Sequence, residues 1–257
     1  MRKLLCLTLF VLTSLVCFSQ EYGPFKFLGI PVDGPQAQFV SQLKAKGFVY
    51  NSFYERYEGQ FNGKNVDVLI HTNHNLVDRV MVMFPATSER EIRNEFNRLL
   101  SQFNENAKYM DLDFNEEIPS DENISYEIMV NNKRYQASFY YFDQDRDVTE
   151  FSNALVDKLS GFLTAEEANR VRESNASFLE LSEDERGEVV DKMAAELGQS
   201  MANLDEESQL RYFLGYLEAL QSLADGNVWF MISESGAQYQ ILLFYDNPRN
   251  QAHGEDL

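Results

Sequence analysis

The stretch Tyr54–Thr72, with the sequence YERYEGQFNGKNVDVLIHT, decides the fold class of this chain. Two strand-like runs, Tyr54–Phe61 and Lys64–Thr72, flank Asn62-Gly63, the dipeptide that most readily adopts the positive φ angles of a two-residue hairpin turn. The apolar residues of the second run recur at every second position: Val66, Val68 and Ile70. The stretch therefore predicts an antiparallel hairpin that turns one face toward a core.

The sequence after this hairpin predicts one more strand and a helix. Leu76–Phe84 is a strand-like run that Pro85 ends, and its inward positions are Val80, Val82 and Phe84. Ser88 and Glu91 then have the spacing of a capping box, which starts a helix. Its apolar residues recur at helical spacing: Ile92, Phe96, Leu99, Leu100 and Phe103.

The sequence before the hairpin predicts a strand followed by a helix. Phe25–Ile30 is a short strand-like run, and Pro31–Pro35 is rich in turn residues. The helix that follows carries Phe39, Val40 and Leu43 on one face, and Gly47 is placed to end it.

Two further hairpins are predicted nearer the C-terminus. Ile124–Val130 and Lys133–Phe142 are strand-like runs around Asn131-Asn132. Val228–Ser233 and Ala237–Tyr245 are strand-like runs around Glu234–Gly236.

Between these hairpins the pattern becomes helical, because Val148–Gly226 contains no proline and no period-two alternation. Two capping-box pairs lie within it: Thr164 with Glu167, and Ser182 with Glu185. We therefore predict an α+β fold in which both ends of the chain build one antiparallel sheet with packed helices. Residues 20–147 and 227–257 form this α+β domain, and residues 148–226 form an all-helical insertion or a separate helical subdomain.

The first nineteen residues have the pattern of a signal peptide. Arg2 and Lys3 precede the apolar run Leu4–Val16, which is too short to span a bilayer, and Cys17-Phe18-Ser19 offers small residues for cleavage. We expect cleavage before Gln20 and a periplasmic or extracellular location. A lipid-anchored Cys17 is the alternative, although Ser14 and Val16 do not fit a lipobox.

Charge and cysteine content limit the classes of partner. The only cysteines, Cys6 and Cys17, lie in the signal peptide, so we expect a mature chain without disulfides. Loss of Arg2 and Lys3 leaves 20 basic and 41 acidic side chains, a net charge of −21. Such a charge repels nucleic acid and keeps a protein soluble. No second apolar stretch is long enough for a membrane span, so we expect a soluble mature protein.

Several segments together resemble a known family. They are FLGIPVDG at residues 27–34, Lys44–Phe48, Phe84-Pro85 and the C-terminal FYDNPRNQAHGEDL at residues 244–257. These segments are similar to a family of small exported hypothetical proteins from Gram-negative bacteria. The resemblance implies the α+β fold and export, and it leaves residues 148–226 unmatched, as an insertion would be. No activity and no site residue follow from it.

The acidic stretch Asp111–Glu122 is the one candidate metal site. Asp111, Asp113, Asn115 and Glu122 occupy positions 1, 3, 5 and 12 of a calcium-loop spacing. Glu116 stands where such a loop requires glycine, and Pro119 stiffens its ninth position. A solvated acidic connector is therefore the favoured interpretation, and bound calcium is the alternative.

Other candidate sites are incomplete. His71 and His74 are two imidazoles where zinc needs three or four protein ligands, so polar turn residues are the favoured interpretation. A packed core is the favoured use of most aromatic residues, and a stacking surface for a protein or glycan is the alternative. The tyrosines to which this alternative applies are Tyr50, Tyr54, Tyr57, Tyr140 and Tyr141. The mature chain has no thiol nucleophile, Gly-x-Ser-x-Gly elbow, phosphate loop or His-Glu-x-x-His motif, so we expect no catalytic and no cofactor-binding residues.

The sequence favours binding over catalysis. We predict an exported, soluble, non-catalytic interaction protein whose partner is an unknown protein or glycan ligand. A secreted carboxylate-dependent hydrolase is one alternative, since acids that meet only in the fold cannot be paired from sequence. A calcium-stabilised envelope protein is the other.

Overall fold

The structure is a computed structural model that describes residues 24–143, 148–159, 169, 172 and 206–251. The described residues divide into two compact units. The sheet unit lies within Pro24–Phe142 and Ala224–Leu257, and the helical unit lies within Asp143–Leu223. Gly226, which the sequence analysis placed in the helical segment, is the first residue of a strand in the sheet unit.

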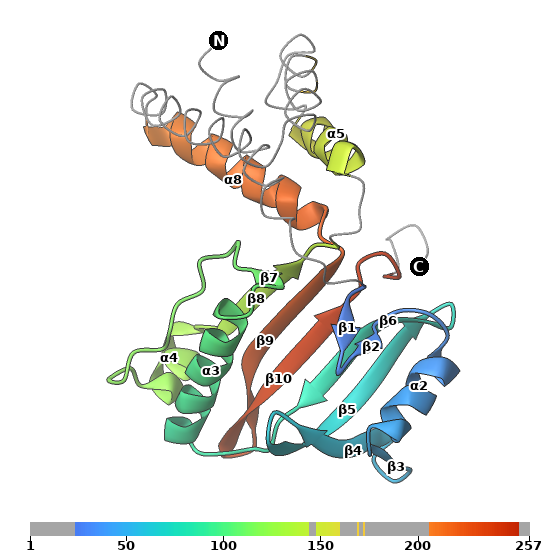
Figure 1. The fold of residues 1–257 in the computed structure, drawn as a ribbon. Helices are drawn as coiled ribbons and strands as arrows, with labels where there is room; N and C mark the ends of the chain where they lie inside the picture. The colour runs from blue at the N-terminus through green and yellow to red at the C-terminus, as the bar shows by residue number, and fades with distance from the viewer. Residues whose placement is uncertain (1–23, 144–147, 160–168, 170–171, 173–205, 252–257) are drawn as a thin grey trace. The chain divides into compact units, whose positions relative to one another are not determined.

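Within the described residues the sheet unit contains one antiparallel sheet of eight strands, and the fold class is α+β, as predicted. In spatial order the strands are β3 (Val49–Asn51), β4 (Arg56–Phe61), β5 (Lys64–Asn73), β6 (Leu76–Met83), β10 (Gln238–Asp246), β9 (Gly226–Ser235), β8 (Gln136–Tyr141) and β7 (Tyr109–Met110). The central pairing is β6 with β10, in which Val82 lies opposite Leu243. The last described strand of the chain, β10, therefore lies in the middle of the sheet beside β6 from the N-terminal half of the sequence (Figure 1).

The hairpin from which the sequence analysis started is confirmed. β4 and β5 pair from Tyr57 opposite Val68 to Phe61 opposite Lys64. Asn62 and Gly63 have φ angles of 51° and 76°, the positive values that a two-residue hairpin turn requires. Val66 and Val68 are buried, so this face of β5 contributes to the core.

Two helices and a small hairpin cover one face of the sheet. They are α2 (Gln36–Ala45), α3 (Glu89–Asn104) and the hairpin of β1 (Lys26–Phe27) with β2 (Ile30–Pro31). Figure 1 shows all of them in front of the sheet. The predicted capping box of α3 is present, because Ser88 Oγ accepts from the Glu91 N–H and the Glu91 side chain accepts from the Ser88 N–H. The five apolar residues predicted to face inward from α3 are all buried: Ile92, Phe96, Leu99, Leu100 and Phe103.

Aromatic side chains fill the space between these layers. The ring of Phe230 on β9 lies 5.0 Å from Phe96 and 6.0 Å from Phe103, both on α3. On the other half of the sheet, the Phe27 ring of β1 lies 5.1 Å from that of Tyr245 on β10. This side of the sheet is called the covered face below.

One predicted hairpin is wrong, because Ile124–Asn131 is a helix, α4. Asn123 caps its first turn by accepting from the Tyr126 N–H, and Asn132 ends it with a φ of 52°. Asn131-Asn132, which favoured a hairpin turn in the sequence, is therefore the end of a helix, with Asn132 as its C-cap. The short strand predicted at Phe25–Ile30 is likewise two strands, since Leu28 and Gly29 both have positive φ angles.

The described part of the helical unit consists of α5 (Val148–Lys158) and α8 (Glu206–Ser222). Phe151, Leu155 and Leu159 are buried, as a helical stripe would be. The predicted capping boxes at Thr164 and Ser182 and the predicted signal peptide lie outside the described residues. No helix in the described part of the chain is long and apolar enough to cross a membrane.

Candidate binding site on the uncovered face of the sheet

The second face of the sheet, called the open face below, carries a continuous band of apolar side chains. The strand register places Leu69 beside Met81, Met81 beside Phe244, and Phe244 beside Trp229. The next row places Met83 beside Leu242 and Leu242 beside Met231. The apolar band is therefore Leu69, Met81, Met83, Trp229, Met231, Leu242 and Phe244. All of them except the buried Phe244 are partly exposed.

Trp229, the single tryptophan of the chain, is fixed within this band. Its Nε1–H donates to Asp246 Oδ2 at 2.9 Å. Its ring stacks on Phe244 with the centroids 4.0 Å apart and the planes 12° from parallel. A partly exposed ring held by these two contacts is preorganised for contact, because little rotamer freedom remains to be lost on binding.

Asp246 also holds Arg79 in place. Arg79 Nε lies 2.6 Å from Asp246 Oδ1 and Nη2 lies 2.8 Å from Oδ2, the two-point geometry typical of arginine with a carboxylate. The hydrogen bond from Asp246 raises the pKa of Arg79 above its ordinary value. The guanidinium also lies 5.4 Å from the centre of the Phe244 ring. One buried carboxylate thus orients both an arginine and a tryptophan on the open face.

A β-bulge places a second carboxylate at the end of this face. His71 lies opposite Arg79 and Thr72 lies opposite Val77, so Asp78 is an extra residue in β6. A bulge of this kind re-aims one side chain, and Asp78 accepts from His71 Nδ1 at 2.7 Å. Asp78 is buried while the His71 side chain is 69% exposed. The opposite ring nitrogen, Nε2, therefore points away from the carboxylate.

These groups line a hollow of about 480 Å³. Its walls include Leu69, His71, Asp78, Arg79, Met81 and Phe244. Among the described lining residues Asp78 is the one carboxylate, and His71 engages it. The hollow combines an apolar floor with oriented polar side chains at one end, which is the composition typical of a binding site.

The predicted calcium-loop residues lie at another edge of the sheet. Asp111 Oδ1 accepts from Asn115 Nδ2 at 2.7 Å, and Asp111 Oδ2 accepts from the Asn115 N–H at 3.0 Å. Asp113 accepts from the Tyr140 hydroxyl at 3.2 Å. Asp111 and Asn115 are thus brought together, but as hydrogen-bond partners of each other.

Glu122, the fourth predicted ligand, has different partners. It accepts from Lys133 Nζ and from the Tyr135 hydroxyl, and the hydrogen bond with Lys133 lowers the pKa of Glu122. The part of the chain that the structure describes contains no group of three or more His, Cys, Asp or Glu side chains arranged to hold a metal ion. The solvated acidic connector stays the favoured prediction for this loop, and bound calcium stays the alternative.

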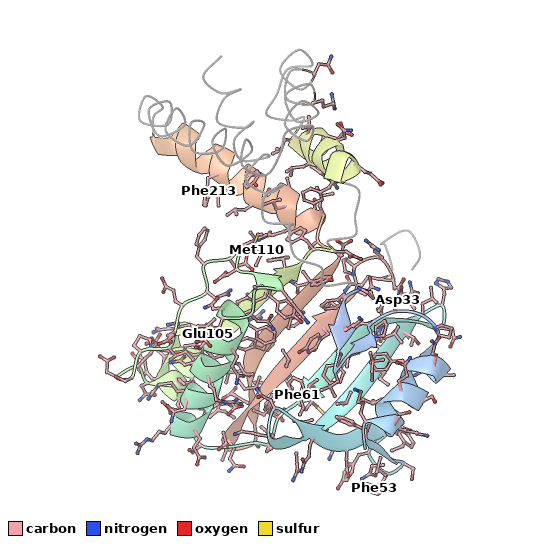
Figure 2. The ribbon with its side chains drawn as sticks, viewed as in Figure 1. Asp33, Phe53, Phe61, Glu105, Met110 and Phe213 are labelled. Carbon is pink, nitrogen blue, oxygen red and sulfur yellow. The ribbon has the colours of Figure 1, made fainter. Side chains whose placement is uncertain are left out.

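The histidines and tyrosines singled out from the sequence do not gather in one place. His74 lies in the β5–β6 turn with a φ of 48°, away from the strand position of His71. Tyr140 and Tyr141 are neighbours in one strand and point to opposite faces, and Tyr141 is buried. Tyr50 and Tyr54 are 45% and 56% exposed near Phe53, which projects from the loop after β3 (Figure 2).

The segments that carry the family resemblance contact each other. Asn247 Nδ2 donates to the Val32 carbonyl at 2.8 Å, and Asn250 Nδ2 donates to Asp33 Oδ1 at 2.7 Å. These bonds tie the end of β10 to the residues after β2. The same C-terminal segment contains Asp246, so it also orients the side chains of the open face.

Comparisons with models of protein families, with curated proteins and with solved structures found no match. The resemblance to an exported family therefore stays a prediction, and the geometry of the open face is the basis for a functional proposal.

Sequence reasoning missed Arg79, Trp229 and Asp246. One signal was present, since Leu76–Met83 and Gln238–Asp246 carry apolar residues on both faces instead of alternating. A strand that is apolar on both faces is expected where both faces are buried. On a face that no described helix of the sheet unit covers, the same pattern indicates a contact surface.

Proposed function

We propose that this chain is an exported, non-catalytic interaction protein that binds a partner protein through the open face. The observation that carries the proposal is the composition of the apolar band. Tryptophan, phenylalanine and three methionines lie beside Arg79, and these are the residue types enriched at the centres of protein interfaces. A protein partner accounts for a band that crosses four strands better than a glycan does.

The charge of the chain supports the same proposal. An exposed apolar band on a neutral protein would promote self-association, whereas the net charge of −21 expected for residues 20–257 opposes it. The same charge steers basic partners toward the molecule over long distances. A basic protein with an apolar contact surface is therefore the class of partner that we expect.

Affinity capture with matched baits tests the open face. The baits are residues 20–257 of the wild type, Met231→Lys in the apolar band, and Met129→Lys on α4, where Met129 is 69% exposed. We expect a partner from envelope extract or culture medium to bind the wild type and Met129→Lys. Met231→Lys should weaken its binding at least tenfold, because a charge would be placed in the desolvated centre of the contact.

The single tryptophan gives a second measurement with the captured partner. Binding at the open face should change the fluorescence of Trp229, because contact removes water from its ring. Equal capture by all three baits, together with an unchanged tryptophan emission, would place the contact elsewhere on the molecule.

Export is part of the proposal and has its own measurement. The charged start, the apolar run and Cys17-Phe18-Ser19 support cleavage before Gln20. Intact-mass analysis of protein from the periplasm or the medium should give a chain that begins at Gln20 and carries no lipid. A diacylglyceryl group on Cys17 would contradict this and indicate a lipoprotein.

A further inference from the structure

The outer edge of β8 has a regular set of backbone groups that point away from the sheet. The Tyr135 carbonyl accepts from the Ile232 N–H at 3.0 Å, so Tyr135 and every second residue after it bond toward β9. The residues between them, Gln136, Ser138 and Tyr140, direct their N–H and C=O groups to the outer edge. The edge therefore offers three successive positions for a peptide group.

Two of these three positions are occupied by peptide-like groups. Tyr140 lies opposite Met110, which belongs to the two-residue strand β7. Figure 2 labels Met110. At Ser138 the side-chain amide of Asn115 replaces a strand. The Ser138 N–H donates to Asn115 Oδ1 at 3.0 Å, and Asn115 Nδ2 donates to the Ser138 carbonyl at 2.8 Å. An amide side chain carries the same donor and acceptor as a peptide group.

The third position, Gln136, opens onto a hollow. Among the described residues no strand is paired with Gln136 on this side, and its side chain is exposed. The hollow has a volume of about 520 Å³, and its floor includes Phe96, Ile118 and Ala137. This volume lies within the range of roughly 300–1,000 Å³ found for ligand sites.

The outer wall of the hollow is held in place before any ligand binds. Asn97 Nδ2 donates to the Ile118 carbonyl, and the Ile118 N–H donates to Asn97 Oδ1, both at 2.9 Å. Arg93 Nη1 donates to the Ser120 carbonyl at 3.0 Å. The loop within Asp111–Glu122, which has the spacing of a calcium loop, is thus held in a fixed path beside the sheet edge.

We propose that this hollow accepts an extended segment of a partner protein, which adds to the sheet by pairing its backbone with Gln136. The occupant is a polypeptide because the two neighbouring positions already hold a peptide backbone and an amide. The segment residue opposite Gln136 exchanges two backbone hydrogen bonds with it. The adjoining residue of the segment points toward Phe96, Ile118 and Ala137, so a small apolar side chain fits there. The site uses the backbone edge of β8, beside the Met231 end of the apolar band, and goes beyond the function proposed above.

Hydrogen exchange on the free protein gives the first test. The Gln136 amide should exchange much faster than the amides of Ala137 and Ser138, because those two are bonded to β9 and to Asn115. A Gln136 amide that is already protected in the free protein would overturn the proposal, since the position would then be filled.

The second test uses a phage-displayed library of random seven-residue peptides selected on residues 20–257. Synthetic copies of the selected peptides should protect the Gln136 amide. They should bind Gln136→Ala with affinity close to wild type and Gln136→Pro at least tenfold more weakly. Proline removes the outward N–H and nothing else in the ladder, and edge strands tolerate it at such positions.

Two controls separate this result from misfolding and from the open face. Gln136→Pro should melt at a temperature close to wild type, and Leu69→Lys, on β5 at the far end of the apolar band, should leave peptide binding unchanged. If Gln136→Pro does not fold, methylation of the peptide amide that pairs with Gln136 tests the same bond and should weaken binding at least tenfold. Failure to select any peptide, or equal binding to wild type and Gln136→Pro, would overturn the proposal.

Discussion

The two faces of the sheet are made from the same strands and differ in what they hold. On the covered face β9 contributes Val228, Phe230 and Ile232, all buried. On the open face the residues between them, among them Trp229 and Met231, stay partly exposed. Charged side chains such as Arg79 and Asp246 lie on the open face. The difference indicates that one face supplies stability and that the other is available for contact.

The largest expected effect tests the covered face. Phe230→Ala removes a buried ring that contacts Phe96, Phe103 and Phe139, so it should lower the free energy of unfolding by about 3–5 kcal/mol. Met231→Ala, the next residue in the same strand, should cost about 1 kcal/mol or less because its side chain is already partly in water. Urea denaturation measures both.

Equal losses for these two variants would contradict the comparison. Such a result would mean that Met231 is as well packed as Phe230, and hence that something covers the open face in the free protein.

A smaller effect is expected at Gly59 of β4. A Cβ at this position would lie 2.6 Å from Cγ of the buried Phe48 ring, closer than packed atoms allow. Gly59→Ala should therefore cost about 1–3 kcal/mol, through displacement of the ring on the covered face. Gln60→Ala is the matched control, because Gln60 is exposed and points to the other face.

Thermal and urea unfolding measure the loss of stability in Gly59→Ala and in Gln60→Ala relative to wild type. We expect Gln60→Ala to stay within about 0.5 kcal/mol of wild type. A Gly59→Ala variant as stable as wild type would show that Phe48 can move without cost.

Much of the fold was predictable because local signals and tertiary pairing agree. Asn62-Gly63 has the φ angles that its hairpin needs, and Ser88 with Glu91 forms the cap that starts α3. The prediction failed at Ile124–Asn131, where the apolar residues of the sequence ISYEIMVN fit the spacing of a strand as well as that of a helix. Asn123 and Asn132 favour the helix, because Asn123 caps its N-terminus and Asn132 caps its C-terminus.

The candidate site was less predictable because it depends on strand register. Arg79 and Asp246 are 167 positions apart in the chain and become neighbours only through the pairing of β6 with β10. The bulge that turns Asp78 toward His71 has no clear sequence signal, since it arises from the pairing of β5 with β6. Likewise, the oxygens of Asp111–Glu122 have a calcium-loop spacing, yet their hydrogen bonds go to Asn115, Lys133 and Tyr135.

The smallest expected effect concerns pH and two tyrosines of the sheet, the buried Tyr245 and the half-buried Tyr109. Burial raises the pKa of Tyr245, on the covered face, well above its usual value of 10.0. Burial also raises the pKa of Tyr109 to about 12. In the unfolded chain both phenols lose their protons near pH 10, while the folded state keeps them neutral. The stability that these neutral phenols contribute is complete below pH 10 and is lost as the pH rises toward and past 12.

Tyr245→Phe tests this dependence without placing a new group in the core. The variant should lose less stability than wild type between pH 9 and pH 11, because one of the phenols that stay neutral in the folded state is gone. Urea denaturation at fixed pH steps measures the slope, and tyrosinate absorbance shows whether ionisation accompanies unfolding. Tyr54→Phe, at a position that is 56% exposed, serves as the control and should keep the wild-type slope. Identical slopes for Tyr245→Phe and wild type would mean that Tyr245 ionises in the folded protein, and that the covered face admits water where the structure shows a sealed core.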